Sequence, residues 1–205
     1  MGKNGALILA AGESSRLGQP KQLIQFRGKS LVRRMVDAAK KARCSPIVVV
    51  IGSDCEEVER ELKAEGAIIV ENENWRLGIG TSIRAGVRKL IDKAPTLEAV
   101  VLLVCDQPFV DARTIARLIA LREKTKRAIV ASRYANTLGV PALFDRSCFQ
   151  ELLALDNATG AKTVILSNRD RVTEFPFPEG KIDIDTLDDY EKLLSASSSA
   201  KKLTK

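Results

Sequence analysis

The stretch GALILAAGESSRLGQPK, residues 5–21, decides the fold of this chain. Residues 6–9 form a continuous apolar run, which predicts a strand covered on both faces, as in a parallel sheet. A loop of small residues follows at positions 10–12, and small residues let backbone N–H groups approach a ligand closely. Because Arg16 and Lys21 add two cations at the far end of the loop, we expect an anionic ligand, and specifically a triphosphate.

The spacing of this loop excludes two common phosphate motifs. A Walker A loop requires Gly, four residues and then Gly-Lys-Ser/Thr, whereas here five residues separate Gly12 from Gly18, and Gln19 follows. A dinucleotide fingerprint requires Gly-x-Gly-x-x-Gly, and this loop has Ala-Ala-Gly instead. A generic strand-to-helix turn with solvated basic residues is the alternative. The combination of small residues and two cations after one strand favours the anion site.

Composition limits the function classes. A chain of 205 residues with 45% apolar and 29% charged residues is typical of one soluble domain. The formal net charge of +7 suits anionic substrates, but the basic residues are spread along the chain. Aromatic residues make up only 4%, which argues against nucleic-acid binding by base stacking. No stretch is typical of a signal peptide or a membrane span, so we expect a cytoplasmic protein without membrane contact.

The chain contains no histidine, which excludes Ser-His-Asp and Cys-His catalysis within a single chain. Its four cysteines (Cys44, Cys55, Cys105 and Cys148) form no Cys-x-x-Cys pair, so we expect no structural zinc site. We expect the protein to occupy a reducing compartment. Catalysis must therefore depend on carboxylates, cations, backbone dipoles or a metal ion.

Apolar strands alternate with amphipathic helices along the rest of the chain. We expect further strands at residues 47–51, 67–70, 99–105 and 128–131, and a polar loop at 133–138. This alternation predicts an α/β fold: a single-domain, three-layer α/β/α sandwich with a mostly parallel, Rossmann-like sheet. The domain should cover residues 1–195, and the polar segment 196–205 should be a disordered tail.

Three further features should lie near the carboxyl edge of this sheet, where open α/β sheets bind ligands. Asp106 directly follows the apolar strand at 99–105. Gly80 and Ser82 open a helix whose N-terminus can bind a polar group. Asp183 and Asp185 alternate with two isoleucines and face one side if the segment is extended. Plain capping or turn formation is the alternative for each of the first two features.

These segments together resemble the MobA-like NTP transferase family, and most closely its molybdenum cofactor cytidylyltransferases. The family loop reads Leu-Ala-Ala-Gly-x-Ser-x-Arg-Met-Gly-x-x-Lys, and this chain departs from it only at Leu17. The resemblance continues at Gly80-Thr81-Ser82-Ile83, at Cys105-Asp106-Gln107-Pro108 and at Asp183-Ile184-Asp185-Thr186, and so covers the chain up to its tail. It implies the fold of the nucleotide-diphospho-sugar transferases.

The resemblance also implies a reaction. A nucleotidyltransferase of this kind moves a CMP moiety from CTP to the terminal phosphate of molybdopterin, releases pyrophosphate and requires Mg²⁺. By similarity, Asp106 and Asp185 would ligate the magnesium ion, and Arg16, Lys21 and Asp106 would be the catalytic residues. The residues that would contact the nucleotide are Leu9, Ala10, Ala11, Gly12, Arg16, Lys21, Gly80 and Ser82. A molybdoenzyme that receives the product is a further partner compatible with the resemblance.

Two departures from the family pattern concern the acceptor. Gly139-Val140-Pro141 stands where the family often has Gly-His-Pro. In residues 155–161 the family often has Leu-x-Gly-Asp-x-Gly-Ala, and Ala158 stands in place of its aspartate. The cytidine assignment depends on Ala11, because guanylyl-transferring relatives tend to have Ala-Gly-Gly. The alternatives are the same chemistry with GTP or with a sugar or alditol phosphate, and a non-catalytic chaperone module for the cofactor. Neither nucleic-acid binding nor a particular oligomeric state is supported by the sequence.

Overall fold

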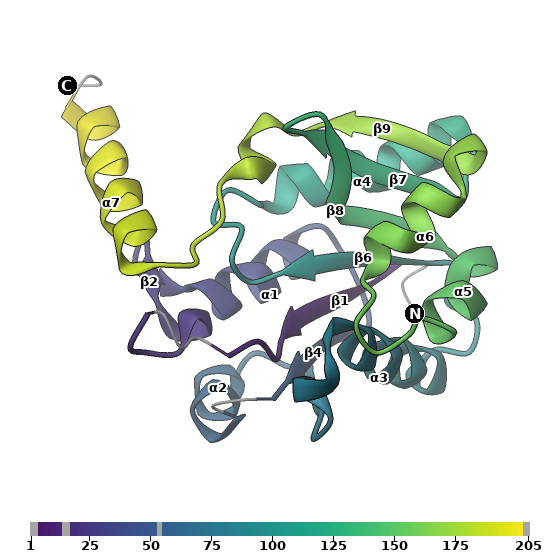
Figure 1. Ribbon diagram of the computed structural model, residues 1–205, viewed down its shortest axis with the longest axis horizontal. Helices are drawn as coiled ribbons and strands as arrows, with labels where there is room; N and C mark the ends of the chain where they lie inside the picture. Colours follow the sequence, from purple (N-terminus) through teal and green to yellow (C-terminus); the bar gives the residue numbers. More distant parts are fainter. Residues whose placement is uncertain (1–3, 14–16, 53–54, 203–205) are drawn as a thin grey trace.

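The computed structural model describes residues 4–13, 17–52 and 55–202, and its centre is a seven-stranded sheet (Figure 1). The strand order is β5-β4-β1-β6-β8-β7-β9, and β8 runs antiparallel to both of its neighbours, β6 and β7. The remaining pairs of this sheet are parallel, which confirms the predicted mostly parallel sheet. The strands are β1 (Asn4–Ala10), β4 (Ile47–Ile51), β5 (Ile68–Glu71), β6 (Ala99–Val104), β7 (Ile129–Tyr134), β8 (Thr137–Asp145) and β9 (Val172–Pro176).

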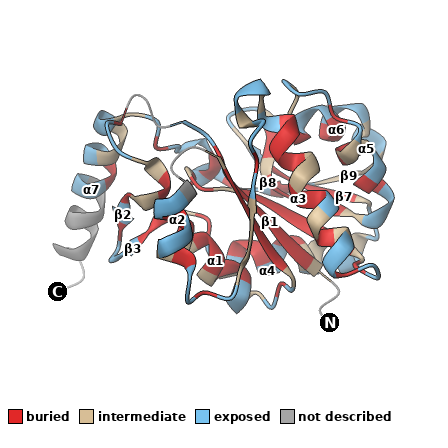
Figure 2. Cartoon of the chain, turned by 90° about the horizontal axis from the view of Figure 1, so that it is seen from below, coloured by how far each residue is buried: buried red, intermediate tan, exposed pale blue. Residues whose placement is uncertain are grey.

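Helices cover both faces of the sheet, as expected for a three-layer sandwich. Alternate residues of β1 enter different hydrophobic clusters, because successive side chains of a strand point to opposite faces. Ala6 and Ile8 pack with α1 (Leu31–Lys41), α2 (Cys55–Leu62) and α4 (Ala112–Thr125). Leu7 and Leu9 pack with α3 (Ile79–Lys93), α5 (Phe149–Leu153) and α6 (Ala161–Ser167). The central strands are accordingly buried along most of their length (Figure 2).

A smaller unit lies beside the sheet, at the end where β1 terminates. The short antiparallel strands β2 (Gln25–Phe26) and β3 (Lys29–Ser30) follow η1 (Lys21–Leu23). Helix α7 (Leu187–Lys202) packs against them through Leu193, which shares a third hydrophobic cluster with Phe26. We expected residues 196–205 to form a disordered tail, and in the structure α7 extends to Lys202. No glycine or proline follows Leu194 to interrupt it.

The main difference from the expected elements is the β7–β8 hairpin. We expected residues 133–138 to form a polar loop, but the two strands run through this segment and leave only Ala135 and Asn136 as the turn. Both turn residues have positive φ angles, 46° and 60°, as a type I′ hairpin turn requires. Because the turn lacks glycine, the sequence does not show the usual hairpin pattern.

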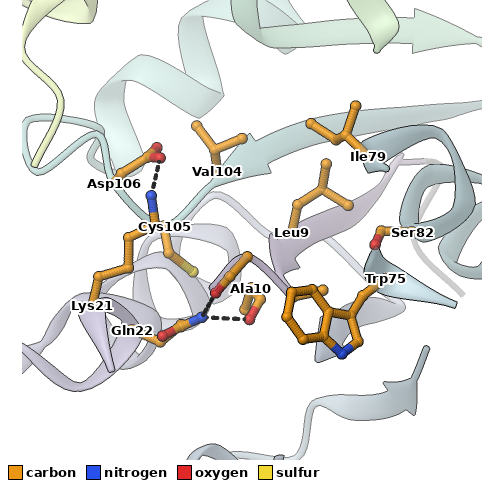
Figure 3. Close-up of a pocket in the computed structure, with 12 residues that line it drawn as sticks. Leu9, Ala10, Lys21, Gln22, Trp75, Ile79, Ser82, Val104, Cys105 and Asp106 are labelled. Carbon is orange, nitrogen blue, oxygen red and sulfur yellow. Dashed lines mark hydrogen bonds and ion pairs between the residues drawn. The ribbon is translucent and has the colours of Figure 1, made fainter. Parts of the chain in front are cut away.

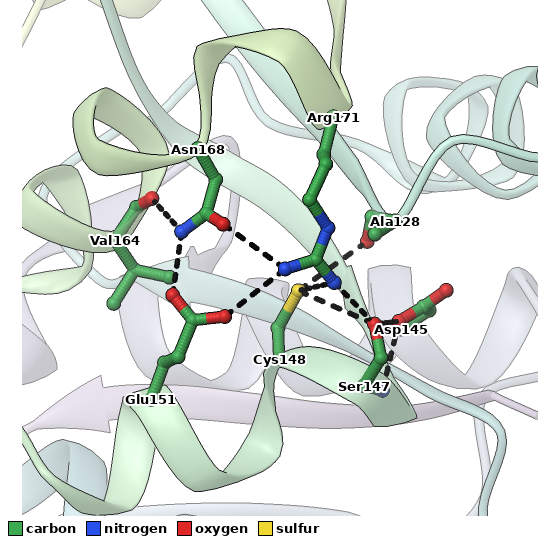
Figure 4. Close-up of polar contacts among 8 residues, drawn as sticks. All are labelled: Ala128, Asp145, Ser147, Cys148, Glu151, Val164, Asn168 and Arg171. Carbon is green, nitrogen blue, oxygen red and sulfur yellow. Dashed lines mark hydrogen bonds and ion pairs between the residues drawn. The ribbon is translucent and has the colours of Figure 1, made fainter.

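Arg171 joins the elements on the far side of the sheet, at the end of η4 (Arg169–Arg171) (Figure 4). Its guanidinium donates to the Glu151 carboxylate of α5 at 3.2 Å and to the Asn168 side chain at 3.0 Å. The Ser147 hydroxyl accepts a further hydrogen bond from it. This arginine is therefore fully engaged in holding α5 and the end of α6 against η3 (Arg146–Cys148).

In the part of the chain that the structure describes, no helix combines the length and the apolar character that crossing a membrane would require.

Candidate nucleotide site

A cavity of about 250 Å³ opens where β1 and β6 end, at the carboxyl edge of the sheet (Figure 3). One wall is the backbone that leaves β1, and the opposite wall comes from the start of α3 and from η2 (Trp75–Leu77). The lining residues are Leu9, Ala10, Ala11, Gly12, Lys21, Gln22, Trp75, Ile79, Ser82, Val104, Cys105 and Asp106. The structure therefore brings together most of the residues that the sequence suggested for the nucleotide.

Lys21 lies at the polar end of this cavity, between two carboxylates. Its Nζ donates to Asp106 Oδ2 at 2.9 Å and to Asp185 Oδ1 at 3.2 Å. Burial alone would lower the pKa of Lys21, but the charge of Asp106 and the hydrogen bonds to both carboxylates outweigh burial and raise that pKa above its ordinary value. Lys21 is therefore charged at neutral pH, and Asp106 and Asp185 converge on one cation.

A third carboxylate, Asp183, belongs to the same group of charges. Partial burial and, after it, the negative charges of Asp106 and Asp185 together raise the pKa of Asp183 to about 6. These aspartates come from the end of β6 and from the irregular segment before α7. This end of the cavity therefore concentrates negative charge around a single described ammonium group.

Gln22 shapes the loop after β1, and the sequence analysis did not identify it. The side chain is only 1% exposed, and its Nε2 donates to the carbonyl oxygens of Ala10 at 2.8 Å and Gly12 at 2.9 Å (Figure 3). These bonds occupy loop carbonyls and hold the loop in one conformation. A glutamine directly after Lys21 is the only sequence feature that could have suggested this role.

The apolar end of the cavity is closed by Trp75. Its ring lies against the chain at the end of β4. A Cβ placed on Gly52 would come within 2.7 Å of the Trp75 side chain. Asn72 is buried beside it and donates to the Thr81 hydroxyl at 2.8 Å and the Ser82 hydroxyl at 2.9 Å. Asn72 thus fixes both hydroxyls at the start of α3, and Ser82 lines the cavity.

Gly80, in contrast, faces away from this cavity. A Cβ at Gly80 would lie 2.0 Å from the Asp156 carbonyl oxygen, and the Gly80 N–H donates to the Asn157 carbonyl at 2.9 Å. Arg84 donates to the Asn157 side chain from the same helix. Close packing of the 155–159 loop on α3 therefore explains this glycine, while its contact with a nucleoside stays a prediction.

A second cavity of about 180 Å³ adjoins the first and shares Ile79 and Val104 with it. Apolar side chains form most of its wall, and Tyr134 and Lys162 supply polar groups. Val140, one of the two departures from the family pattern, also lines it. Gln107 connects this region to the Asp106 loop, because its Nε2 donates to the Val140 carbonyl at 3.2 Å and the Gly180 carbonyl at 2.9 Å.

Arg16, predicted to contact the phosphates, lies outside the described residues. No group of three or more ligating side chains in the described ranges is arranged to hold a metal ion with protein atoms alone. Asp106 and Asp185 nevertheless share one cation, the Lys21 ammonium, and both supply hard oxygen donors. Two carboxylates suit Mg²⁺ or a similar ion, which keeps several waters and takes substrate phosphates as its other ligands.

Comparison with known proteins agrees with this geometry. The family described as "MobA-like NTP transferase domain" matches residues 6–172. The crystal structure of Rv0371c from Mycobacterium tuberculosis H37Rv is 31% identical to this chain, covers 94% of it and 97% of that protein's chain, and superimposes with a TM-score of 0.80. A manganese complex of Rv0371c, 28% identical, matches 94% of this chain and 98% of the other with a TM-score of 0.77.

Curated relatives match over shorter stretches. The bifunctional protein GlmU of Syntrophotalea carbinolica is 38% identical over 127 residues, which are 60% of this chain and 26% of that protein. Nicotine blue oxidoreductase of Paenarthrobacter nicotinovorans is 32% identical over 114 residues, 55% of this chain and 54% of that protein. The chain thus spans between about a quarter and about half of the length of these relatives.

Proposed function

Because this chain belongs to the family of MobA-like NTP transferase domains, we propose that it transfers a CMP moiety from CTP to the terminal phosphate of molybdopterin. An oxygen of the acceptor phosphate attacks the α-phosphorus of CTP. The new bond joins the two phosphates, the bond between the α-phosphorus and the β-phosphate breaks, and pyrophosphate leaves. The attacking oxygen is already ionised, so the reaction needs no strong general base, and a chain without histidine can catalyse it.

The observation that carries this proposal is the position of Lys21 between Asp106 and Asp185 at the polar end of the cavity. Nucleotidyl transfer depends mainly on positioning and on neutralising phosphate charge. Lys21 supplies a charged donor within reach of a triphosphate in the cavity. Asp106, Asp183 and Asp185 would repel that triphosphate unless a cation accompanied it, which supports a metal-dependent reaction.

Asp106 and Asp185 are the residues that would hold the metal ion. The ion would neutralise the charge that develops on the phosphates and on the leaving pyrophosphate. The manganese complex of Rv0371c supports the use of a divalent ion, and Mg²⁺ is our proposal for this chain because the donors are carboxylates. Lys21 would turn from the two carboxylates toward the triphosphate when nucleotide and metal occupy the site.

The second cavity is the place that we propose for the acceptor. It shares the side chains of Ile79 and Val104 with the first cavity, so a ligand there can reach a nucleotide in the first. Its apolar walls suit the flat ring system of a pterin, and Lys162 can pair with a phosphate. Gln107 keeps β8 in contact with the Asp106 loop, because its Nε2 donates to the Val140 carbonyl.

Pyrophosphate release tests the proposal directly. The protein is incubated with molybdenum cofactor, Mg²⁺ and each of the four NTPs in turn, and pyrophosphate is measured together with the mass of the product. We expect turnover with CTP and a product that carries CMP. Turnover with GTP alone would overturn the cytidine assignment, and turnover only with a sugar or alditol phosphate in place of the cofactor would overturn the acceptor.

The same samples separate transfer from two other activities. One similar protein is named as an oxidoreductase, so NADPH and NADH oxidation is followed in parallel, and we expect none above the background. A cofactor chaperone would bind the cofactor without releasing pyrophosphate from any NTP. Either result would contradict the proposed transfer.

A further inference from the structure

A third cavity, with a charged lining, lies on the α1–α4 face of the molecule, away from the nucleotide site. It encloses about 340 Å³ between the turn from β2 to β3, the outer side of α1 and the first residues of α4. Its polar lining consists of five basic side chains and two carboxylates: Arg27, Lys29, Arg34, Lys41, Arg113, Asp37 and Asp111. This third cavity has no lining residue in common with the nucleotide cavity. We call it the basic groove.

The two carboxylates of the groove are already engaged. Asp37 forms an ion pair with Lys29. Asp111 caps α4, because its Oδ1 accepts hydrogen bonds from the Thr114 backbone N–H at 2.8 Å and from the Thr114 hydroxyl at 3.0 Å. Within the described residues, no ion pair is formed by Arg27, Arg34, Lys41 or Arg113. The groove therefore keeps a surplus of positive charge.

Arg34 is the central residue of this surplus, and the protein satisfies it only in part. Its Nη2 donates to the Pro108 carbonyl at 3.1 Å, and its guanidinium lies 4.9 Å from the centre of the Phe26 ring. Its Nε is buried without a hydrogen-bond partner among the described residues. Burial and then the charge of the neighbouring Arg27 lower the pKa of Arg34, and the charges of Asp111 and Asp37 offset this lowering only in part. A buried donor and an adjacent like charge both destabilise the protein unless an acceptor lies nearby.

The opposite side of the same helix shows the usual arrangement. Arg33 and Lys40 pair with Glu65 at 2.8 and 2.6 Å. Arg171 on the far side of the sheet is likewise surrounded by acceptors (Figure 4). Arg34 and Lys41 are seven residues apart on α1 and therefore share one face, and the groove that this face lines holds three further cations beside Asp37 and Asp111. Arg33 Nε is also buried without a hydrogen-bond partner, but among the described residues the Arg33 guanidinium is paired with the Glu65 carboxylate, whereas Arg34 forms no ion pair.

We propose that the basic groove binds the phosphate group of a small-molecule ligand, at a site separate from the nucleotide cavity. Guanidinium and ammonium groups from three segments surround the groove, and phosphate oxygens can accept hydrogen bonds from several of them at once. The ligand would supply an acceptor for the Arg34 Nε and further negative charge beside Arg27 and Arg34. This proposal is independent of the transfer reaction that we propose for the other cavity.

Calorimetric titration with inorganic pyrophosphate, without divalent metal, tests this site. The titration uses the variant Lys21→Gln, because Lys21 would otherwise contribute a second phosphate site. We expect this variant to bind pyrophosphate. Adding Lys41→Gln and Arg113→Gln should weaken binding at least tenfold, because both side chains are exposed on the rim of the groove and their loss should not disturb the core.

A matched control removes the same charge elsewhere. Lys93→Gln and Lys124→Gln, also in the Lys21→Gln background, change two exposed basic residues at the far ends of α3 and α4. We expect this pair to change the affinity less than twofold. An equal loss of affinity in both pairs would mean that only the overall charge attracts the anion, and this result would overturn the proposal. An absence of pyrophosphate binding in the Lys21→Gln background would overturn it as well.

Discussion

Asp106 and Asp185 come from distant parts of the chain and meet at one ammonium group, Lys21 Nζ. The lysine and the two carboxylates act on a triphosphate in opposite ways. Lys21 attracts it, the carboxylates repel it, and a divalent cation would reverse the effect of the carboxylates. The single-residue predictions that follow depend on this balance.

Asp106→Ala should reduce kcat by about 10³-fold or more, since it removes one of the two proposed metal ligands. The protein should remain folded, because Asp106 follows the end of β6 and is not part of the core. The measurements are steady-state pyrophosphate release and circular dichroism. Asp92→Ala is the control, because Asp92 is exposed on α3, and it should keep wild-type turnover. Unchanged turnover in Asp106→Ala would contradict the proposed role.

Gln22→Ala should raise the KM for the nucleotide and lower the free energy of unfolding by about 2 kcal/mol. The reason is that the Ala10 and Gly12 carbonyls would lose the donor that holds the loop. Urea denaturation and initial rates measure the two effects. Gln25→Ala removes the same group from an exposed position and should change neither quantity. A Gln22→Ala protein with a wild-type KM would show that the loop conformation does not depend on this clamp.

Ala11→Gly tests the basis of the cytidine assignment. Ala11 lines the nucleotide cavity, and its methyl group is the only side-chain atom by which this loop differs from the Ala-Gly-Gly form. We expect the ratio of kcat/KM for CTP to that for GTP to fall at least tenfold in the variant. A ratio that does not change would mean that base selection depends on other residues.

At the scale of elements, α3 and the loop at 155–159 form one unit. Gly78 and Gly80 allow the loop backbone to lie against the helix, and Arg84 donates to the Asn157 side chain. Ile79 and Ser82, at the start of the helix in this unit, line the nucleotide cavity. The sequence predicted the helix and its polar start, but it attributed Gly80 to the ligand rather than to this contact.

Gly80→Ala should therefore destabilise the protein by about 3 kcal/mol, because its Cβ would lie 2.0 Å from the Asp156 carbonyl oxygen and 2.8 Å from the Thr159 carbonyl oxygen. Thermal unfolding measures the change. Gly160→Ala is the matched control, since the nearest atom to its Cβ is Ile79 Cγ2 at 3.4 Å, and it should cost less than about 1 kcal/mol. Equal stability of the two variants would contradict the packing explanation.

The β7–β8 hairpin shows what local sequence fails to predict about an element. Residues 133–138 are polar enough to suggest a loop, yet β7 and β8 pair through them up to Tyr134 and Thr137. β6 pairs with residues 142–145 of β8, while residues 137–139 pair with β7, the strand directly before them in the chain. Cross-strand pairing thus overrides the preference of the single segment. The helix starts at Ser30 and Asp111, in contrast, depend on side chains that cap their own helices.

At the scale of the whole molecule, the charge around Asp183 should appear in the pH dependence of stability. The pKa of Asp183 is raised to about 6, so the folded protein binds this proton more tightly than the unfolded chain does. The unfolding free energy should therefore decrease as the pH rises from about 4 through 6, and the stabilisation is lost above that range. Asp183→Asn should be more stable than the wild type at pH 8 and nearly equal to it at pH 4.

Urea denaturation at both pH values, without divalent metal, measures this difference. Asp92→Asn makes the same change at an exposed carboxylate on α3 and is the control. A difference between Asp183→Asn and the wild type that is equal at pH 4 and pH 8 would show that Asp183 is not repelled by Asp106 and Asp185 in the folded state.

The sequence by itself determined the α/β class, the mostly parallel sheet and the loop that follows its first strand. These features depend on local patterns, namely apolar runs, helical periodicity and small residues, that need no distant partner. Together with the family resemblance, it also predicted Lys21, Asp106 and Asp185 as site residues.

Only the tertiary structure decided which side chains meet. Lys21 lies between Asp106 and Asp185, Gln22 clamps the loop, Gly80 packs against a carbonyl, and the basic groove forms where three segments converge. Hydrogen bonds, close packing and repulsion between charges all depend on distances between residues far apart in the chain. A sequence pattern contains no such distance, so these contacts became visible only when the chain was folded.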